Sequence, residues 1–382
     1  MVSVRTAIAG LGFMGSTHIR TLRRLGIEVA GVLGVTHQEG QSAAANFHIE
    51  KAYTSFEELA ADPGVDVVHI CTPNYLHYPM VKAALLAGKH VLCEKPLATT
   101  AHDTAELVEI AKDLPLAVAV NYNLRYYPLI QEARARVRDG QLGRIRLIHG
   151  GYLQDWLCYE TDWNWRLETN QGGELRAVSD IGTHWLDMVT WITGLKPVAL
   201  IADLATLIPA RCKPDSEVST FVNRLAIKEH TKMVPIQTED YAAVLIRFEH
   251  GVHGVLTLSQ ASPGRKNYLW WEIDGSQASL HWEQENPNEL WVGHRMRPNE
   301  VILKDPALMQ PGAREYAAFP GGHAEGYPDT FTRLQCDFYR YIQEQDFSRP
   351  PLFPSITDGH RALVYCEAIL KSYRENCWVN LT

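Results

Sequence analysis

A lysine and a histidine stand out as residues that could exchange a proton with a substrate. Pro96 follows Lys95 directly and restricts it to extended backbone, so that the lysine side chain is aimed reproducibly. Asp180 and His184 are four positions apart, so on a helix they share one face and can both point into a cleft. Histidine titrates near neutral pH, and a desolvated lysine becomes a better proton acceptor. We therefore predict Lys95, His184 and Asp180 as a catalytic group.

A glycine-rich turn follows the first expected strand and opens the first expected helix. Its spacing, G-x-G-x-x-G over residues 10–15, lets the chain turn tightly, lets a pyrophosphate approach the backbone, and lets helix and strand pack closely. The phosphates would meet the helix N-terminus. This context predicts a nicotinamide dinucleotide site. Its candidate residues are Gly10, Gly12, Phe13, Met14 and Gly15.

The residue at the end of the second expected strand departs from the usual NAD pattern. An Asp or Glu normally binds the ribose there, and this chain has Gly34. The sequence shows neither a nearby acid that would repel a 2′-phosphate nor an arginine that would bind one. We take Gly34 and Thr36 as candidate cofactor contacts, and the choice between NAD(H) and NADP(H) stays open.

The surrounding elements predict an α/β chain with two domains. Up to residue 122, strands alternate with helices about every 25 residues, which is typical of a parallel, doubly wound Rossmann sheet. From residue 123 to 382 we expect an α+β domain for substrate binding and oligomerisation, with a large, mostly antiparallel open sheet. Its expected strands are residues 145–153, 198–207, 242–248, 252–259 and 268–275, followed by a long surface excursion over 286–328.

Assembly is expected from the second sheet. We predict that one sheet face exposes apolar residues such as Leu256 and Leu258. Large apolar patches usually mark interfaces, and closed symmetric oligomers are common. A homodimer or homotetramer is the expected state.

The overall composition argues against several other classes of protein. The 382 residues carry a formal net charge of -8, whereas proteins that grip nucleic acid or anionic membranes are usually basic. There is no apolar run long enough to span a bilayer, and the first residues read poorly as a signal peptide. The seven cysteines form no C-x-x-C, which favours a reduced, cytoplasmic protein. The histidines show no zinc-site spacing, so no metal is expected.

Four motifs in chain order resemble those of the Gfo/Idh/MocA oxidoreductases, the glucose–fructose oxidoreductase and inositol dehydrogenase family. They are the glycine turn, Thr72-Pro73-Asn74 with His77, Glu94-Lys95-Pro96, and residues 180–184 with the sequence D-I-G-T-H. The resemblance covers the whole chain. It implies a Rossmann domain plus an open-sheet domain, with Lys95 and His184 acting together across the interdomain cleft. It also implies cofactor contacts from Thr72, Asn74, His77, Glu94, Lys95, Asn123 and Arg125, the last two in an N-x-R-x-x-P element.

Further residues are candidates for the substrate. Trp163 could stack on a sugar ring, and Arg166 could bind a carboxylate, sulfonate or phosphate. His323 and Tyr327 lie in a glycine-rich loop with polar side chains. Tyr152, near the end of an expected strand, joins Lys95, Asp180 and His184 in the predicted substrate site.

The predicted activity is hydride transfer between a nicotinamide cofactor and a secondary alcohol or ketone of a sugar or cyclic polyol. Two alternatives remain open. One is a redox-assisted, NAD-dependent glycoside hydrolase of the same superfamily, similar to sulfoquinovosidases, which would consume no net cofactor. The other is a non-catalytic dinucleotide sensor, which would have little reason to keep both Lys95 and His184.

Overall fold

The computed structural model describes residues 4–215 and 231–381, and the chain folds as two compact units. The first unit comprises residues 1–123, 170–173 and 331–363, and the second comprises 124–169, 174–330 and 364–382. Residues 170–173 and 331–363, which the sequence analysis places in the second domain, thus pack with the first unit. The functional division at residue 122 stays a prediction.

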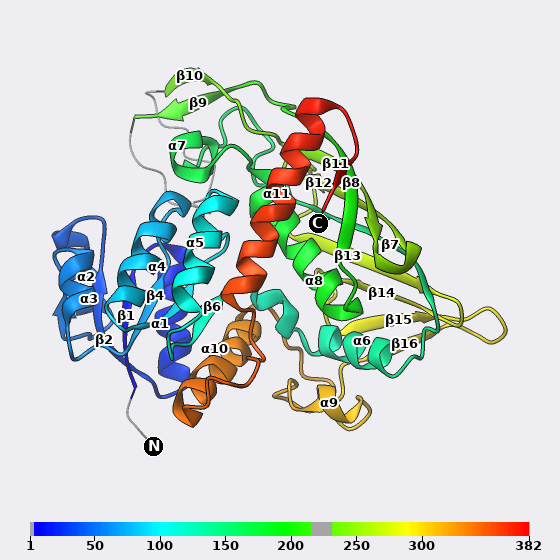
Figure 1. Ribbon diagram of the computed structural model, residues 1–382, viewed down its shortest axis with the longest axis horizontal. Coiled ribbons are helices and arrows are strands. Elements are labelled where there is room, and N and C mark those ends of the chain that lie inside the picture. The colour runs from blue at the N-terminus through cyan, green and yellow to red at the C-terminus, as the bar shows by residue number, and fades with distance from the viewer. Residues whose placement is uncertain (1–3, 216–230, 382) are drawn as a thin grey trace. The chain divides into compact units, whose positions relative to one another are not determined.

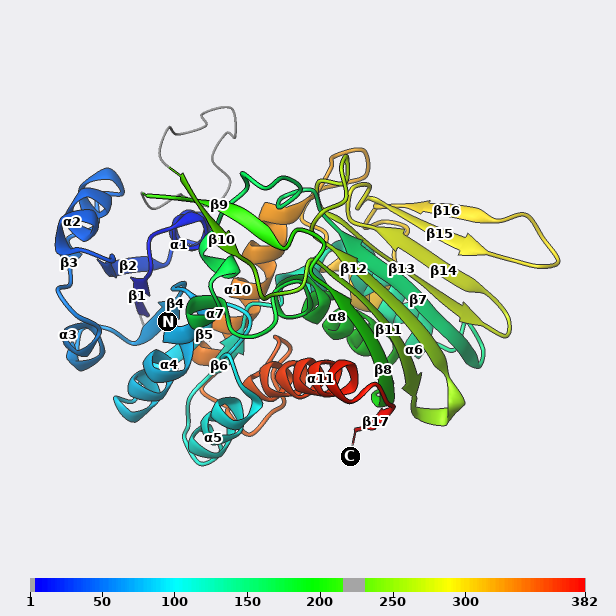
Figure 2. The ribbon, with the colours of Figure 1, turned by 90° about the horizontal axis from the view of Figure 1, so that it is seen from above.

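The first unit is built on a six-stranded parallel sheet (Figure 1). Its strand order is β3-β2-β1-β4-β5-β6, which can be followed in Figure 2. The strand order reverses between β1 and β4, and ligands of such sheets bind at the carboxyl ends of the strands beside this reversal. β4 and most of β1 are buried, and apart from Thr6 and His69 their buried side chains are apolar, as expected when helices cover both sheet faces. The strands are β1 (Arg5–Ala9), β2 (Glu28–Leu33), β3 (Lys51–Ala52), β4 (Val67–Ile70), β5 (His90–Cys93) and β6 (Val118–Val120).

Hydroxyl side chains fix where several helices of this unit begin. Thr36, Ser55 and Thr100 each accept a hydrogen bond from the backbone N–H three residues on, which satisfies a donor that the first turn leaves open. The helices are α1 (Phe13–Arg24), α2 (His37–Asn46), α3 (Phe56–Ala61), the 3-10 turn η1 (Asn74–Leu76), α4 (His77–Leu86), α5 (Ala101–Ala111), α10 (Tyr327–Glu344) and α11 (Ile356–Glu375), the last two shared with the second unit.

The second unit contains a nine-stranded sheet in the order β16-β15-β14-β13-β7-β12-β11-β8-β17. Neighbouring strands are antiparallel except β7 and β12, which run parallel. The strands are β7 (Ile145–Leu153), β8 (Pro197–Ala205), β11 (Tyr241–Phe248), β12 (His253–Ser259), β13 (Tyr268–Gly275), β14 (Ser279–Glu283), β15 (Glu289–Gly293), β16 (Glu300–Leu303) and β17 (Val379–Asn380), with a separate pair β9 (Ala210–Pro214) and β10 (Thr231–Pro235).

Helices pack on one face of this large sheet (Figure 2). α8 packs against β7 and β13, and α6 packs against α8 and β15. The helical segments are the 3-10 turn η2 (Asn123–Tyr126), α6 (Pro128–Arg138), the 3-10 turn η3 (Trp165–Leu167), α7 (Thr169–Gly172), the π-helical segment η4 (Val178–Gly182), α8 (Thr183–Thr193), the 3-10 turn η5 (Glu249–Gly251) and α9 (Pro311–Arg314).

Two expectations for this sheet are wrong. The segment 286–328 is not only a surface excursion, because it contains β15 and β16. Leu256 and Leu258 are both fully buried, whereas Leu245 and Val255, which pair across β11 and β12, are exposed. Successive side chains of a strand point to opposite faces, so an error of one position in assigning the core face inverts the whole prediction.

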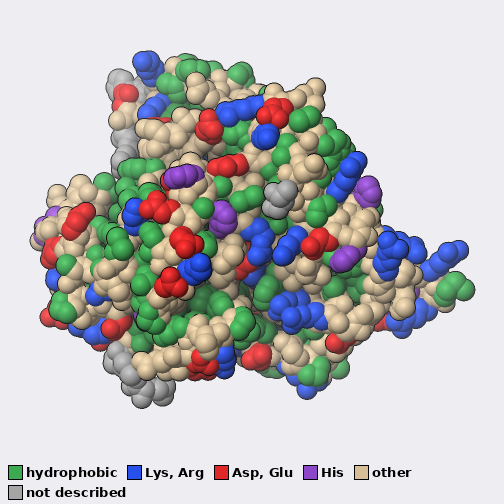
Figure 3. Space-filling view, viewed as in Figure 1, with side chains coloured by type: hydrophobic (Ala, Val, Ile, Leu, Met, Phe, Trp, Pro, Cys, Tyr) green, Lys and Arg blue, Asp and Glu red, His purple; other side chains and the backbone are tan. Residues whose placement is uncertain are grey.

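The surface carries charges of both signs. Lys, Arg, Asp and Glu side chains are interspersed over the face shown in Figure 3. Among the described residues, no helix has the length and apolar character needed to cross a membrane.

Candidate active site

The glycine turn of the first unit forms an open cradle at the start of α1. Gly10 has a φ of +92°, and a Cβ there would lie 2.6 Å from the backbone of Cys71. A Cβ on Gly15 would lie 1.9 Å from the carbonyl oxygen of Gly10, so helix and strand can pack only with glycine there. A Cβ on Gly12 would meet nothing within 4 Å, and no side chain caps the helix. A helix start with no side-chain cap and with free space beside Gly12 fits the pyrophosphate of a dinucleotide.

The end of β2 has a carboxylate that the sequence analysis did not find there. Glu39, in the first turn of α2, folds back so that its Oε2 accepts a hydrogen bond from the Val35 N–H at 2.7 Å. A Cβ on Gly34 would lie only 2.8 Å from this oxygen. Thr36 caps the same turn by accepting the Glu39 N–H at 3.2 Å. A carboxylate from the following helix thus lies close to the strand end where an acid is usually found.

His77 joins the two turns that lie at the carboxyl ends of β4 and β5. Its Nδ1 lies 2.7 Å from the carbonyl oxygen of Pro96, and its Nε2 lies 2.8 Å from that of Thr72. The ring is buried, and burial lowers the pKa of His77. His77 therefore fixes the backbone on which Lys95 is carried. Nearby, the Asn74 amide donates to the carbonyl of Gly172 at 3.1 Å.

Glu94, the residue before Lys95, is buried and closely held. Its Oε1 accepts hydrogen bonds from Asn121 Nδ2 at 2.6 Å and from His18 Nε2 at 3.1 Å, and its Oε2 lies 3.3 Å from the Lys95 backbone nitrogen. Burial opposes ionisation, but His18, Lys95 and Asn121 outweigh it and hold the pKa of Glu94 below its ordinary value. Glu94 is thus a buried carboxylate that positions the chain at Lys95.

A chain of buried hydrogen bonds leads to this carboxylate. Thr6 Oγ1 lies 2.7 Å from the Tyr339 hydroxyl, which lies 2.9 Å from His69 Nε2, and His69 Nδ1 lies 2.9 Å from His18 Nδ1. Burial, reinforced by the His18 ring, lowers the pKa of His69 well below its usual range, so His69 is neutral. If Tyr339 donates to His69, then His69 donates to His18 and His18 to Glu94. Sequence reasoning missed this chain because its members are far apart in sequence.

In the second unit, Asp180 lies in η4 and His184 lies in the first turn of α8, and both are buried. Asp180 belongs to the π-helical segment η4, not to the regular helix that the sequence spacing predicts; such segments often occur at functional sites. Its Oδ1 accepts from Arg166 Nε at 3.2 Å, and its Oδ2 accepts from Gln260 Nε2 at 3.0 Å. Asp180 is therefore held in a fixed orientation, and the positive charge of Arg166 is compensated.

Tyr152 completes a polar cluster beside His184. The two rings lie 6.3 Å apart. The Tyr152 hydroxyl donates to Asn267 Oδ1, which also accepts from Gln154 Nε2 at 3.0 Å. Burial raises the pKa of Tyr152 well above its usual range, so its hydroxyl stays protonated. Gln154, Gln260 and Asn267 were not predicted; the one available signal is that Gln154 and Gln260 each follow an expected strand.

A second carboxylate fixes the backbone that leads into Asp180. Glu239 accepts the Arg176 N–H at 2.9 Å and the Val178 N–H at 2.9 Å. Burial raises the pKa of Glu239 to about 7. The adjacent Asp240 forms a fully buried ion pair with Arg176.

Arg125 forms a buried ion pair within the second unit. Its Nε donates to Asp187 Oδ2 at 2.7 Å, its Nη2 donates to Asp187 Oδ1, and its guanidinium lies 4.6 Å from the ring centre of Trp191. The pair ties η2, which includes the buried Asn123, to α8, which carries His184. The cofactor roles of Asn123 and Arg125 stay predictions.

The remaining candidates lie in other surroundings. Trp163 packs against the small apolar cluster of Leu157, Leu167 and Ile236. His323 is exposed, and Tyr327 begins α10. The Lys213 ammonium lies 5.5 Å from the ring centre of Trp163, and His323 Nδ1 lies 3.3 Å from the carbonyl oxygen of Gly321. The substrate roles of Trp163, His323 and Tyr327 stay predictions.

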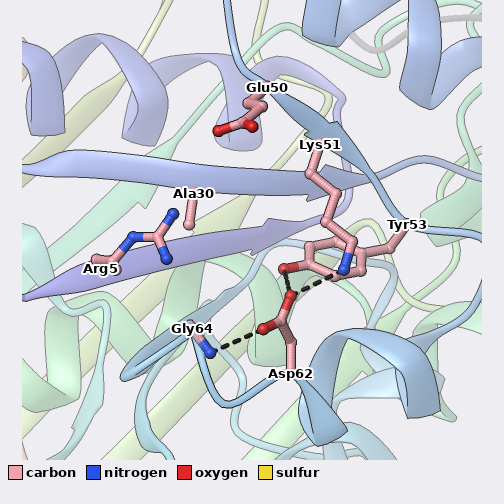
Figure 4. A pocket seen from close by; sticks show the side chains of 7 residues that line it. All are labelled: Arg5, Ala30, Glu50, Lys51, Tyr53, Asp62 and Gly64. Carbon is pink, nitrogen blue, oxygen red and sulfur yellow. Dashed lines mark hydrogen bonds and ion pairs between the residues drawn. The ribbon is translucent and has the colours of Figure 1, made fainter.

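A pocket of about 290 Å³ in the first unit is not this site (Figure 4). It is lined by Arg5, at the amino end of β1, whereas ligands of parallel sheets bind at the carboxyl ends. Its polar groups satisfy one another: Asp62 accepts from Lys51 at 2.8 Å, from Tyr53 at 2.9 Å and from the Gly64 N–H at 2.7 Å. We assign it no ligand.

A group with metal-binding side chains lies on the second unit's sheet. His149, Glu272 and Asp274 bring ligand atoms within 4.8 Å of one another and are half-buried. His149 Nε2 and Asp274 Oδ2 lie 3.4 Å apart, as in an ordinary ion pair. We assign no metal to this group.

An open dinucleotide cradle on a Rossmann sheet, together with an acid/base cluster on a second sheet, defines a nicotinamide-dependent oxidoreductase. Residues 4–122 match the family model described as "Oxidoreductase family, NAD-binding Rossmann fold", and residues 130–281 match the "GFO/IDH/MocA C-terminal domain". The chain belongs to the Gfo/Idh/MocA family, and the predicted family, fold class and cofactor class are confirmed.

Relatives of known name support this assignment. Levoglucosan dehydrogenase of Pseudarthrobacter phenanthrenivorans is 29% identical over 100% of this chain and 99% of its own length. 1,5-Anhydro-D-fructose reductase of Ensifer adhaerens is 35% identical over 48% of this chain and 54% of its own. A solved structure of levoglucosan dehydrogenase with NADH and L-sorbose superposes with a TM-score of 0.89 at 28% identity, covering 100% of both chains. An inositol dehydrogenase homologue with NAD+ from Azotobacter vinelandii gives 0.86 at 25% identity, covering 99% and 97%.

Proposed function

We propose that the protein transfers a hydride between NAD(H) or NADP(H) and a secondary alcohol or ketone of a sugar or cyclic polyol. The observation that carries this proposal is the buried cluster of Asp180, His184 and Tyr152, placed on a chain whose relatives include sugar dehydrogenases and reductases. The bound nicotinamide would accept or return the hydride.

The residues of the chain would handle the proton. In oxidation the alcohol loses a hydride from carbon and a proton from oxygen, and we propose that Lys95 and His184 take up that proton. Asp180, anchored by Arg166 and Gln260, would orient the reacting group through a hydrogen bond. Thr72, Asn74, His77 and Glu94 would shape the cofactor side, and Gly12 would leave room for its phosphates.

Turnover of the cofactor tests the proposal. The reduced cofactor is followed by absorbance with a panel of sugars and polyols, using NAD and NADP separately. Lys95→Ala and His184→Ala should each lower kcat by roughly 10²- to 10⁴-fold, the usual effect of losing a general acid or base. The double variant should lose less than the product of both, because the two residues serve one proton transfer.

Controls separate catalysis from folding. Lys112→Ala, which removes an exposed lysine of the first unit, should leave turnover unchanged. Affinity for NADH should survive Lys95→Ala. Near-normal turnover in Lys95→Ala would remove the proposed proton path, and sugar hydrolysis without net cofactor change would instead indicate a redox-assisted glycoside hydrolase.

We also propose a cytoplasmic homo-oligomer that uses the sheet face opposite α8. Leu245 and Val255 are exposed there as a cross-strand pair. Light scattering at micromolar concentration should show a dimer or tetramer, and Leu245→Lys should shift it toward a monomer.

A further inference from the structure

Two glutamines follow the ends of two neighbouring central strands of the second unit's sheet. β7 and β12 are parallel neighbours in which Leu153 pairs with Ser259, and Gln154 and Gln260 are the next residues of each strand. The Gln154 N–H donates to the Ser259 carbonyl at 2.8 Å, which continues the strand pairing up to this point. Each glutamine is only 1% exposed. A pair of long polar side chains is therefore buried where the two strands end together.

The orientation of the Gln260 amide is determined by its partner. Its Nε2 lies 3.0 Å from Asp180 Oδ2. A carboxylate oxygen only accepts hydrogen bonds, so the amide must turn its NH2 group toward Asp180 and its carbonyl oxygen away. That oxygen, Oε1, is buried and has no hydrogen-bond partner among the described residues.

Gln154 is held in the same manner by a different partner. Its Nε2 donates to Asn267 Oδ1 at 3.0 Å, and the same oxygen accepts from the Tyr152 hydroxyl. The carbonyl oxygen Oε1 of Gln154 is also buried without a partner among residues 4–215 and 231–381. Both amides are thus anchored through nitrogen on residues that surround Asp180 and His184, and both leave an acceptor unused.

Unused buried acceptors are uncommon in folded proteins, because a buried oxygen gives up its hydrogen bonds to water. A single buried amide without a partner would not by itself indicate a ligand site, because Gln335 on α10 also has such an amide in the described part of the chain. The pair differs because its two members are adjacent in the sheet and both are anchored to the acid/base cluster. A ligand that donates two hydrogen bonds would satisfy both.

We propose that Gln154 and Gln260 bind two hydroxyl groups of the substrate and select a neutral polyhydroxylated compound over a sugar acid. This inference rests on the proposed function. Carbonyl oxygens present the negative end of a dipole, and the Asp180 carboxylate lies beside them. Arg166, a cation beside Asp180, is already compensated by that carboxylate. A carboxylate, sulfonate or phosphate on the substrate needs hydrogen-bond donors. The carbonyl oxygens of Gln154 and Gln260 are acceptors and would not bind it.

The first test uses the wild-type enzyme, so it does not depend on a variant that folds. Once a sugar that the enzyme turns over is known, its single-deoxy analogues and its uronic acid are compared by kcat/KM. Loss of the hydroxyl bound by either glutamine should lower kcat/KM on the order of tenfold, because its acceptor is left without a partner. The uronic acid should be turned over at least tenfold less efficiently than the neutral parent. Equal efficiency for the parent and its uronic acid would overturn the proposed selection.

The second test assigns each hydroxyl to a glutamine. In Gln260→Leu, one deoxy analogue should no longer show a lower kcat/KM than the parent sugar, while the second analogue still does. In Gln154→Leu, the second analogue should lose its deficit and the first should keep it. Gln335→Leu, which removes a buried glutamine outside the cluster, should keep both deficits. Calorimetric binding of parent and analogues in the presence of NADH gives a readout that does not depend on turnover.

The outcomes separate the inference from the proposed function. If no sugar or polyol is turned over or bound by a folded protein that binds NADH, the proposed function fails. If the wild type turns over a sugar, and both glutamine variants still show a lower kcat/KM for every deoxy analogue that the wild type discriminates against, the proposed activity stands. The role of Gln154 and Gln260 is then refuted.

Discussion

Replacing Arg125 by methionine distinguishes a structural role for this residue from the cofactor contact that the sequence motif predicts. The Arg125 and Asp187 side chains are 3% and 6% exposed and form a two-point ion pair between η2 and α8. Methionine keeps the length and apolar character of the arginine stem and removes its charge. The substitution leaves the Asp187 carboxylate buried without its cation.

The expected cost follows from that burial. Removing one member of a buried ion pair typically destabilises a protein by about 3–5 kcal/mol, because the other charge stays buried without its partner. For a unit of this size, that corresponds to a fall in Tm of roughly 6–20 °C. In the double variant Arg125→Met/Asp187→Leu no charge remains buried, and most of the lost stability should return.

Differential scanning calorimetry and NADH titration decide between the two roles. Arg125→Met should melt lower and still bind NADH once folded, whereas Arg138→Met, at an exposed arginine of α6, should change neither property. An unchanged Tm combined with weakened NADH affinity would refute the structural role and support the predicted cofactor contact.

Three further predictions follow from single positions. Glu39→Arg should raise the ratio of kcat/KM for NADP over NAD by on the order of tenfold, because it replaces repulsion of a 2′-phosphate by attraction; an unchanged ratio would show that Glu39 lies away from the ribose. Gly12→Val should fold and lose dinucleotide affinity in a fluorescence titration, whereas Gly15→Val should fail to give folded protein, since its Cβ would lie 1.9 Å from a carbonyl oxygen. Burial lowers the pKa of His90 to about 4, so the contribution of the neutral His90 to stability is lost as pH falls from about 6.5 to 4. Burial raises the pKa of Glu239 to about 7, so the contribution of the protonated Glu239 is lost as pH rises from about 4.5 to 7. In urea unfolding between pH 7 and 4.5, His90→Gln should flatten the acid-side loss of stability and Glu239→Gln should steepen it, each by up to about 1.4 kcal/mol per pH unit; the opposite signs would contradict these assignments.

Local sequence patterns were sufficient for the parts of the fold that local physics controls. The glycine turn and the strand 145–153 lie at the positions that the sequence predicts, because steric limits and alternation act over a few residues. Thr36, which we predict as a cofactor contact, is also the cap of α2.

The side chains around the reaction centre were harder to predict. Gln154 and Gln260 are neighbours only because β7 and β12 pair in parallel. The separation of the two strands in the sequence gives no sign of that pairing. Glu39 was overlooked because its carboxylate folds back by one helical turn to the position where an acid was sought. Sequence patterns therefore identified Lys95, Asp180 and His184 as candidates. Of the two side chains that hold Asp180, they identified Arg166, as a substrate contact, but not Gln260.

Residues 331–363 pack with the first unit although they are synthesised near the end of the chain, and this affects the order in which the chain can fold during synthesis. Tyr339 closes the buried chain of hydrogen bonds that begins at Thr6, and Ala119 in β6 pairs with Ser355. The ribosome delivers these residues only after the whole nine-stranded sheet except β17. Domains usually fold in the order in which they emerge. Here the amino-terminal unit remains incomplete, with His69 lacking Tyr339 and β6 lacking Ser355, until nearly the entire polypeptide has been made.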